Sequence, residues 1–309
     1  MQFQLEHIQK RALIYQKIRA FFNALHYLEV DTPLLGKSTN TDIHIQSIQA
    51  TTCDRPVYLQ TSPEFAMKRL LAAGSGSIYQ ICHAFRDEEK GRYHHPEFTL
   101  LEWYSCGFDY QALMTQLEEL IGSLLDVTLP FQRMSYFECF KTHLQLDLKS
   151  ASLDDCRQCV SQHIPGIDTL QLNRDDCLDL LISQVISKQF KGFTFVYDYP
   201  SSQASLSKLK QSNPDVAERF ELFFNELELA NGFSELTDSK EQRIRFEQDN
   251  ARRVESGVQT YPIDEDFLQA LEQGMPECAG VAVGLDRLLM VMFEEESLKP
   301  VLTLDTLNF

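Results

Sequence analysis

The chain of 309 residues is 43% hydrophobic and has a formal net charge of -17, from 45 acidic and 28 basic residues. A chain of this length can bury a sizeable core, and no stretch approaches the roughly 18 apolar residues that a membrane span needs. An acidic surface repels the phosphate backbone, so the charge disfavours broad electrostatic capture of nucleic acid. The N-terminus lacks a positive segment followed by an apolar one, so we expect a cytoplasmic protein.

Periodicity in the first half of the chain predicts one long helix followed by extended segments. The helix covers residues 5–27, where apolar side chains recur at helical spacing. The extended segments are residues 28–33, 57–60, 77–86 and 98–104. The last two flank a charged loop, which predicts a pair of antiparallel strands. Residues 110–144 are predicted to be helical.

The second half begins with a polar segment, at about 145–192, that predicts a small helical insertion. Strands are predicted at 193–197, 220–224, 227–236 and 280–284, and helices at 238–256, 264–273 and 285–293. Eight scattered cysteines include one close pair, Cys156 and Cys159, with no further ligands at zinc-site spacing, so we expect reduced thiols. The pattern is α+β, with a mainly antiparallel β-sheet flanked by helices, in a single domain over 1–309.

The segment from Phe85 to Tyr104 is the most informative part of the sequence. Arg86 ends a predicted strand, and a guanidinium there can grip a phosphate and a carboxylate together because it is a planar fork of five donors. Phe98 can stack on a purine. The alternative is a charged hairpin loop with ordinary salt bridges.

Two further clusters suggest nucleotide chemistry. Glu221 and Glu228 suit Mg²⁺ that bridges phosphates, but they lie an odd number of residues apart, so a bulge or separate strands would have to bring them to one ion. The alternative is a solvated acidic strand face. In Gly280–Arg287, a strand of small residues lets backbone approach a ligand, and Arg287 opens a helix. An ordinary buried junction is the alternative.

Together these motifs resemble the catalytic domain of the class II aminoacyl-tRNA synthetases, and within them the lysyl enzymes. The first family motif corresponds to residues 5–33, the second to Phe85-Arg86-x-Glu88 with the loop to Glu102, and the third to Gly284-Leu285-Asp286-Arg287. Residues 230–238 are similar to the lysine-specific signature. The resemblance covers residues 8–293 and is weakest over 145–192.

Three departures indicate a subfamily. The chain starts directly with the catalytic domain, without the OB-fold that reads the anticodon. His95 stands where the family has asparagine, and Ala282 where the lysyl enzymes have glycine. These features are similar to freestanding lysyl-tRNA-synthetase paralogues, which transfer a lysine-type group to a lysine ε-amine of elongation factor P. The resemblance therefore implies this protein as acceptor, with tRNA unlikely, and a homodimer formed through the first motif.

Carried over position by position, the resemblance implies ATP and Mg²⁺ as cofactors. Arg86 and Arg287 would be catalytic, with Arg86 on the α-phosphate and the substrate carboxylate and Arg287 on the distal phosphates. The other implied ATP contacts are Asp87, Glu88, His95, Phe98, Glu228, Leu229 and Gly284, and the implied metal ligands are Glu221 and Glu228.

The same resemblance implies a site for lysine or β-lysine. Glu64 would bind the backbone-type amine, and Glu235 with Tyr104 would bind the terminal ammonium. The remaining implied contacts are Ser62, Pro63, Glu102, Asn231, Phe233 and Ala282. The methyl group of Ala282 would favour a substrate whose amine sits one carbon further along; the alternative is a tolerated small core residue.

Three other functions stay open at this point. A minimal synthetase that charges tRNA would need a basic face. An asparagine-synthetase-like paralogue would share the fold, although residues 231–235 favour lysine. A non-catalytic paralogue should have lost Arg86, Glu228 or Arg287, and all three are present.

Overall fold

The computed structural model describes residues 5–125, 129–304 and 307, and the chain divides into two compact units. Unit 1 comprises Met1–Val127 and Glu235–Phe309, and unit 2 comprises Thr128–Ser234. The single catalytic domain over 1–309 stays a prediction. In the described part of the chain, no helix combines the length and the apolar composition needed to cross a membrane.

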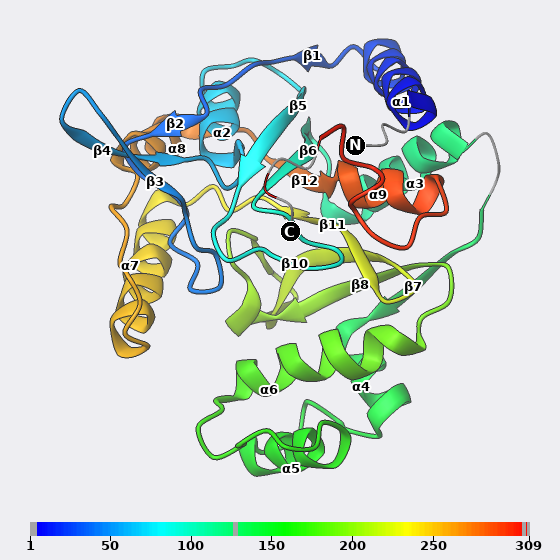
Figure 1. The fold of residues 1–309 in the computed structure, drawn as a ribbon. Helices are drawn as coiled ribbons and strands as arrows, with labels where there is room; N and C mark the ends of the chain where they lie inside the picture. The colour runs from blue at the N-terminus through cyan, green and yellow to red at the C-terminus, as the bar shows by residue number, and fades with distance from the viewer. Residues whose placement is uncertain (1–4, 126–128, 305–306, 308–309) are drawn as a thin grey trace. The chain divides into compact units, whose positions relative to one another are not determined.

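Unit 1 is built around four strands in the order β1-β5-β6-β12 (Figure 1). Their bounds are β1 (Leu28–Glu29), β5 (Ile78–Phe85), β6 (Glu97–Cys106) and β12 (Cys278–Gly284). β1 runs parallel to β5, whereas β5, β6 and β12 pair in antiparallel fashion. The predicted antiparallel pair on either side of the charged loop is therefore confirmed.

Helices cover this sheet and extend unit 1. They are α1 (Leu5–Ala24), α2 (Glu64–Ala72), α3 (Tyr110–Leu125), α7 (Ser239–Glu255), α8 (Glu265–Gly274) and α9 (Leu285–Met292). α1 buries Phe22, whose ring stacks on Tyr79 of β5 at 4.5 Å between centroids. α2 packs on α8 through stacked rings of Phe65 and Phe267 at 4.8 Å. These contacts make α2 a fixed support for the side chains at its N-terminal end.

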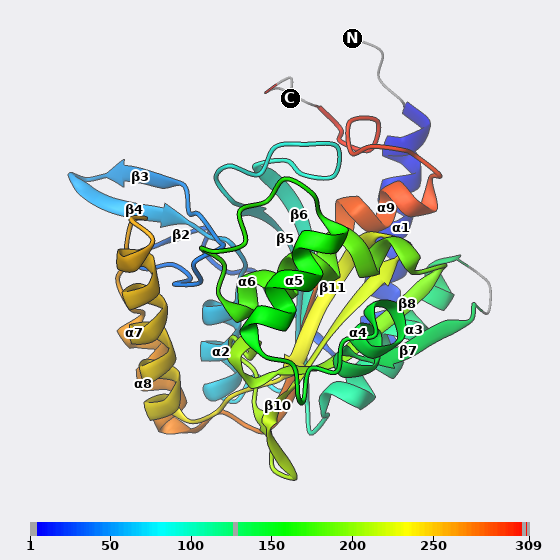
Figure 2. The same cartoon turned by 90° about the horizontal axis from the view of Figure 1, so that it is seen from below.

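A separate three-stranded sheet lies beside α7 and α8 (Figure 2). It has the order β2-β4-β3, with β2 (Leu35–Gly36), β3 (Gln49–Thr52) and β4 (Arg55–Leu59). The fully buried guanidinium of Arg253 in α7 ties the loop before β3 to this helix, because it donates hydrogen bonds to the carbonyl of Asp42 and to Gln46 Oε1.

Unit 2 pairs its strands in the order β11-β10-β8-β7, with β9 on β10. The strands are β7 (Phe131–Ser135), β8 (Phe193–Pro200), β9 (Leu209–Lys210), β10 (Asn213–Phe224) and β11 (Leu227–Ser234). The helices are α4 (Tyr136–Leu144), α5 (Leu153–His163), α6 (Arg174–Leu181), a π-turn at Ile182–Ile186, and 3₁₀ turns at Ser187–Gln189 and Ser201–Gln203. The segment predicted as a helical insertion thus holds α5, α6 and two of these turns.

The core of unit 2 explains half of the eight cysteines. Cys139, Cys156, Cys159 and Cys177 are buried in one apolar cluster, and every cysteine is a free thiol. Burial raises the pKa of the Cys139 thiol to about 12, which keeps it protonated. Among the described residues, no group of three or more His, Cys, Asp and Glu side chains is placed to hold a metal ion. These thiols therefore act as small apolar side chains.

The prediction of continuous helix over 110–144 was wrong. α3 ends at Leu125, residues 126–128 lie outside the described part, and Phe131–Ser135 form β7 parallel to β8. Pro130 lacks the backbone donor that a helix needs, and Phe131 stacks on Phe193 of β8 at 4.9 Å. Ser135 then starts α4 with a capping box to Glu138. Helical propensity on both sides had hidden the strand.

Candidate active site

One face of the unit 1 sheet brings together most of the side chains expected to bind substrate. Residues directly opposite each other on paired strands point to the same face, and so do alternate residues along a strand. Glu102 of β6 lies opposite Ala282 of β12, and Tyr104 lies opposite Gly280. Phe98 shares this face because it is an even number of residues from Glu102.

Glu64, Lys68, Glu102, Tyr104 and Glu235 form a group that we call the acidic cluster. Lys68 Nζ lies 2.5 Å from Glu64 Oε1 and 2.5 Å from Glu235 Oε2. Tyr104 donates a hydrogen bond to Glu102 Oε1 at 2.7 Å. Glu64 is placed by the first turn of α2, and Glu235 by its backbone hydrogen bond to the carbonyl of Cys278 in β12. Residues far apart in sequence thus converge on one site.

The electrostatics of the acidic cluster favour a cationic ligand. Burial, reinforced by the charge of Glu64, raises the pKa of Glu102 to about 8. Burial also raises the pKa of Glu235, although the ammonium of Lys68 opposes the shift. Glu102 Oε2 and Glu235 Oε1 are buried and have no hydrogen-bond partner among the described residues. Buried acceptors of this kind are costly, so the cluster is short of positive charge and of donors.

Gly280 lets β12 lie directly against this cluster. A Cβ atom at this position would come within 2.5 Å of Tyr104 Cδ1 and closer still to Glu235 Oε1. Ala282, two residues along the same face, is half-buried. The close approach of backbone expected for this strand is therefore present, and Gly280 makes it possible.

Arg86 lies at the end of β5, next to Phe98. Its guanidinium carbon is 5.1 Å from the centroid of the Phe98 ring, and its backbone N–H donates to the carbonyl of Pro96 at 2.9 Å. The charge of Arg86 also lowers the pKa of Glu102, against the larger effect of burial. The arginine thus lies near both the aromatic ring and the acidic cluster.

The loop after Arg86 is fixed by its own backbone contacts. Asp87 N–H donates to the carbonyl of Gln46 at 2.8 Å, and Glu88 adopts a left-handed conformation with φ of 64°. His95 is buried, and its Nδ1 lies 2.7 Å from the carbonyl oxygen of Glu97. The histidine that replaces the family asparagine therefore holds the start of β6.

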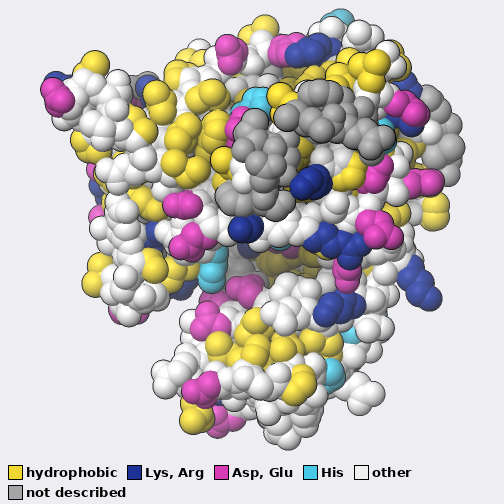
Figure 3. All heavy atoms as spheres, in the orientation of Figure 1, with side chains coloured by type: hydrophobic (Ala, Val, Ile, Leu, Met, Phe, Trp, Pro, Cys, Tyr) yellow, Lys and Arg dark blue, Asp and Glu magenta, His cyan; other side chains and the backbone are white. Residues whose placement is uncertain are grey.

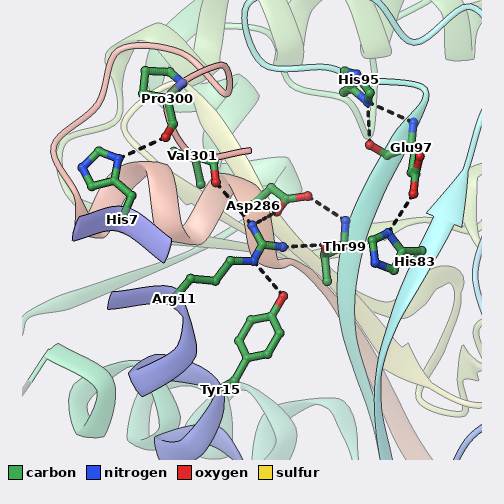
Figure 4. A network of polar contacts seen from close by, with 10 residues as sticks. All are labelled: His7, Arg11, Tyr15, His83, His95, Glu97, Thr99, Asp286, Pro300 and Val301. Atoms are coloured by element: carbon green, nitrogen blue, oxygen red, sulfur yellow. Dashed lines mark hydrogen bonds and ion pairs between the residues drawn. The ribbon is translucent and has the colours of Figure 1, made fainter. Parts of the chain in front are cut away.

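The junction between β12 and α9 is held by a buried ion pair (Figure 4). Arg11 of α1 donates to Asp286 Oδ1 and to Thr99 Oγ1, each at 2.7 Å, and Asp286 Oδ2 accepts from the backbone N–H of Thr99 at 2.7 Å. Gly284 is the residue before α9, and Arg287 in its first turn donates to the carbonyl of Tyr93 at 3.1 Å. All three family motifs meet here, and Arg287 contacts the loop that follows Arg86.

Ser62 and Pro63 lie at the entry to α2, directly before Glu64. They line a cavity of about 150 Å³ together with Phe65, Arg69 and Asp264, among others. Pro63 is the residue before α2, and its carbonyl accepts from the N–H of Met67. Their visible role is to start the helix that carries Glu64.

In unit 2, a bulge brings the two carboxylates expected to bind metal toward each other. Glu221 of β10 pairs with Asn231 of β11, and the register shifts after Leu222, so that Phe223 pairs with Glu228. Burial and the charge of Glu228 raise the pKa of Glu221 to about 7. The two acids are thus on separate strands, with a bulge between them, as the odd spacing required. Phe233 is half-buried and Leu229 buried on β11.

Two charged residues at these sites had no role assigned from sequence. Lys68 links Glu64 and Glu235, and Arg219 links Glu221 Oε1 at 2.6 Å with Asn231 Oδ1 at 3.3 Å. Arg219 also lies 4.5 Å above the ring of Tyr199. For Lys68, the available signal in the sequence was its spacing of four residues from Glu64 on one helix. For Arg219, it was the alternation of residues on β10, which places Arg219 and Glu221 on one face.

The family model for tRNA synthetases class II (D, K and N) matches residues 2–306. The chain therefore belongs to this family, which confirms the resemblance drawn from the three motifs and the α+β fold with an antiparallel sheet. As a member, it is an enzyme of the ATP-dependent ligase type.

Several relatives are similar over almost their whole length. The chain is 44% identical to the elongation factor P–(R)-β-lysine ligases of Pseudoalteromonas translucida (strain TAC 125) and Proteus mirabilis (strain HI4320). It is 42% identical to the ligase of the same name from Salmonella gallinarum (strain 287/91 / NCTC 13346). Each comparison spans 307 residues, 96% of this chain and 94% of the relative.

Proposed function

We propose that the chain activates (R)-β-lysine, or lysine, with ATP and transfers the activated acyl group to a lysine ε-amine of elongation factor P. The acidic cluster is the observation that carries this proposal. It offers three carboxylates, Glu64, Glu102 and Glu235, beside the guanidinium of Arg86. A lysine-type amino acid has two ammonium groups and one carboxylate, which is the complementary set of charges. The names of the relatives support the same substrate and acceptor.

In the first step, a carboxylate oxygen of the amino acid attacks the α-phosphorus of ATP, and pyrophosphate leaves. Arg86 binds the substrate carboxylate and the α-phosphate, and Arg287 binds the distal phosphates. Phe98 stacks on the adenine, with Asp87, Glu88 and His95 around the base and ribose and Gly284 and Leu229 as further ATP contacts. Negative charge builds up on the phosphate oxygens as the bond forms, so fixed cations and good positioning lower the barrier.

The substrate is oriented by its two amines. Glu64 binds the amine nearer the carboxylate, and Glu235 with Tyr104 binds the terminal ammonium. Glu102, Asn231, Phe233 and Ala282 shape the site, and Ser62 and Pro63 position Glu64.

Mg²⁺ would be held by Glu221 and Glu228 together with phosphate oxygens. The mutual repulsion that raises the pKa of Glu221 makes this pair a suitable ligand set for a cation. Two protein carboxylates are enough, because Mg²⁺ in nucleotide sites completes its shell with phosphates and water. When bound, the ion would neutralise charge on the phosphates.

In the second step, the neutral ε-amine of the acceptor attacks the carbonyl carbon of the adenylate. An amide bond forms, AMP leaves with the electrons of the broken C–O bond, and the amine gives up a proton. A net charge of -17 disfavours tRNA as the acceptor. The visible face in Figure 3 carries acidic side chains among the basic ones. Dimerisation through residues 5–33 and a cytoplasmic location, where translation factors act, belong to the same proposal.

Two parallel reactions test the proposal. The protein is incubated with ATP, Mg²⁺ and labelled (R)-β-lysine or lysine, and then elongation factor P or bulk tRNA is added. We expect pyrophosphate release that depends on the amino acid, and one added lysyl unit on one lysine of elongation factor P by mass spectrometry. Labelled tRNA without a mass shift on the protein would instead identify a minimal synthetase. If neither amino acid supports pyrophosphate release, the proposed enzyme function is refuted.

A further inference from the structure

Lys68 is a fully buried cation at the centre of the acidic cluster. Its side chain is 0% exposed, with Nζ at 2.5 Å from one oxygen each of Glu64 and Glu235. Phe267 of α8 covers it, with its ring centroid 5.8 Å from Nζ. Burial by itself lowers the pKa of Lys68, but the carboxylates of Glu235 and Glu64 outweigh it and raise the pKa above its usual range. The two carboxylates therefore favour the ammonium form of this side chain.

The charges of the acidic cluster do not cancel. When the carboxyls of Glu64, Glu102 and Glu235 are all ionised, the ammonium of Lys68 balances one of them and two negative charges remain. Glu102 Oε2 and Glu235 Oε1, which have no hydrogen-bond partner in the part of the chain that the structure describes, belong to two acids whose pKa is raised. A lysine-type substrate supplies two ammonium groups, while its own carboxylate is assigned to Arg86. The charges of the ionised cluster and of the two substrate ammonium groups thus cancel only if the charge of Lys68 is counted.

We propose that Lys68 is a built-in counter-cation: it neutralises one of the three carboxylates, so that the ionised acidic cluster carries two negative charges and is selective for an amino acid with two ammonium groups. This inference rests on the proposed function, because it takes a lysine-type amino acid as the substrate. Without Lys68 the cluster would hold a third uncompensated carboxylate. Buried carboxylates in that position take up protons, and a protonated carboxyl no longer attracts an ammonium group.

The proposal predicts a specific pH dependence. The groups that interact with Lys68 are Glu64 on α2, Glu102 on β6, Glu235 before α7 and Cys278 on β12, and Tyr104 lies against these carboxylates through its hydrogen bond to Glu102. Cation binding favours ionised carboxylates, so kcat/KM should rise with pH until the carboxyls of the empty site have ionised, and then level off. Loss of an opposite charge at this distance raises a carboxyl pKa by roughly 1–3 units, so removal of Lys68 should move this rise to higher pH.

Lys68→Met tests the proposal in the full chain. The measurement is kcat/KM for amino-acid-dependent pyrophosphate exchange between pH 6 and 9, with (R)-β-lysine, lysine and norleucine, which lacks the second ammonium. We expect the rise of kcat/KM with pH, which we call the acid limb, to move up by about one pH unit or more for the substrates with two ammonium groups. The preference for lysine over norleucine should fall about tenfold at neutral pH and recover at high pH.

Two variants serve as controls. Lys68→Arg retains the charge and should keep the acid limb at its wild-type pH. Arg69→Met makes the same loss of a cation one residue away on α2, where Arg69 is exposed and 3.9 Å from Asp266, and should also keep the wild-type limb. A shift confined to Lys68→Met supports the counter-cation.

An equal loss of activity at every pH, or no change at all, would overturn the proposal and leave Lys68 as a structural residue. If Lys68→Met does not fold, Lys68→Gln gives the same comparison. Calorimetry on the wild-type protein adds a test without substitution, because a site that already neutralises one of three carboxylates can release at most two protons when lysine binds. Release of three would overturn the proposal. A wild-type protein inactive with both lysines would instead show that the proposed function has failed.

Discussion

Replacing Gly280 by alanine tests how closely β12 approaches the acidic cluster. The added methyl carbon would lie 2.5 Å from Tyr104 Cδ1, whereas unstrained carbon atoms stay about 3.5–4.0 Å apart. Tyr104 or the strand must therefore move by about 1 Å. Tyr104 is 2% exposed and is held by its hydrogen bond to Glu102, and Glu235 on the other side is held by Lys68. Neither neighbour can give way without disturbing the proposed contacts to the terminal ammonium.

Overpacking of this kind costs about 1–3 kcal/mol in folding free energy. A comparable loss in substrate binding corresponds to a drop in kcat/KM for (R)-β-lysine of about 5- to 140-fold, at 1.4 kcal/mol for each factor of ten. Urea unfolding and pyrophosphate exchange measure the two effects separately. Gly91→Ala is the control, because a methyl group there would meet nothing closer than His94 Nδ1 at 4.0 Å. A Gly280→Ala protein with wild-type stability and kcat/KM within twofold of wild type would refute this reasoning.

Three further predictions test other parts of the site. Arg86→Ala should lower amino-acid-dependent pyrophosphate exchange by about 10²–10³-fold, the scale for one lost oxyanion donor, and wild-type exchange would contradict its role. Arg11→Met leaves the Asp286 carboxylate buried without its cation, so the free energy of unfolding, measured with urea, should fall by about 3–5 kcal/mol. Arg19→Met, which removes an exposed ion pair with Glu29, should lower the free energy of unfolding by less than about 1 kcal/mol. Equal losses in the Arg11 and Arg19 variants would contradict this prediction. Ala282→Gly should raise kcat/KM for lysine relative to (R)-β-lysine by about one to two orders of magnitude, since one methylene is worth roughly 1–3 kcal/mol in discrimination. An unchanged ratio would mean that Ala282 does not set the preference.

Local sequence patterns predicted the strands around the site because each strand has its own clear periodicity and punctuation. β5 and β6 were expected from two apolar runs around a charged loop, and their antiparallel pairing follows from that short connection. The odd spacing of Glu221 and Glu228 likewise required a bulge or separate strands if both were to face one ion, and the structure has both, with the register shift after Leu222. β7 was not predicted because it is only five residues long and lies between two helices. Its parallel partner, β8, is also distant in sequence.

Side chains that act through long-range contacts were the harder part of the site to predict. Glu64 and Lys68, four residues apart on α2, indicate in sequence an ordinary helical pair worth a few tenths of a kcal/mol. Only the tertiary fold brings Glu235 to the same ammonium and encloses it beneath Phe267. The small residues of β12 indicated a close approach of backbone, but not that Tyr104 and Glu235 are the groups approached.

The difference between these two kinds of residue follows from what each one must do. In the proposed function, Arg86, Arg287 and Glu228 act directly on a ligand whose chemistry is fixed, so residue type and motif order already restrict the role expected of them. Lys68 acts on other protein groups, and a lysine in a helix is compatible with many environments. Its effect depends on how many carboxylates share its charge and on how completely water is excluded, and both are properties of the folded chain. The charge balance of a buried site therefore has to be derived from the structure, even where the motifs that surround it can be recognised in the sequence.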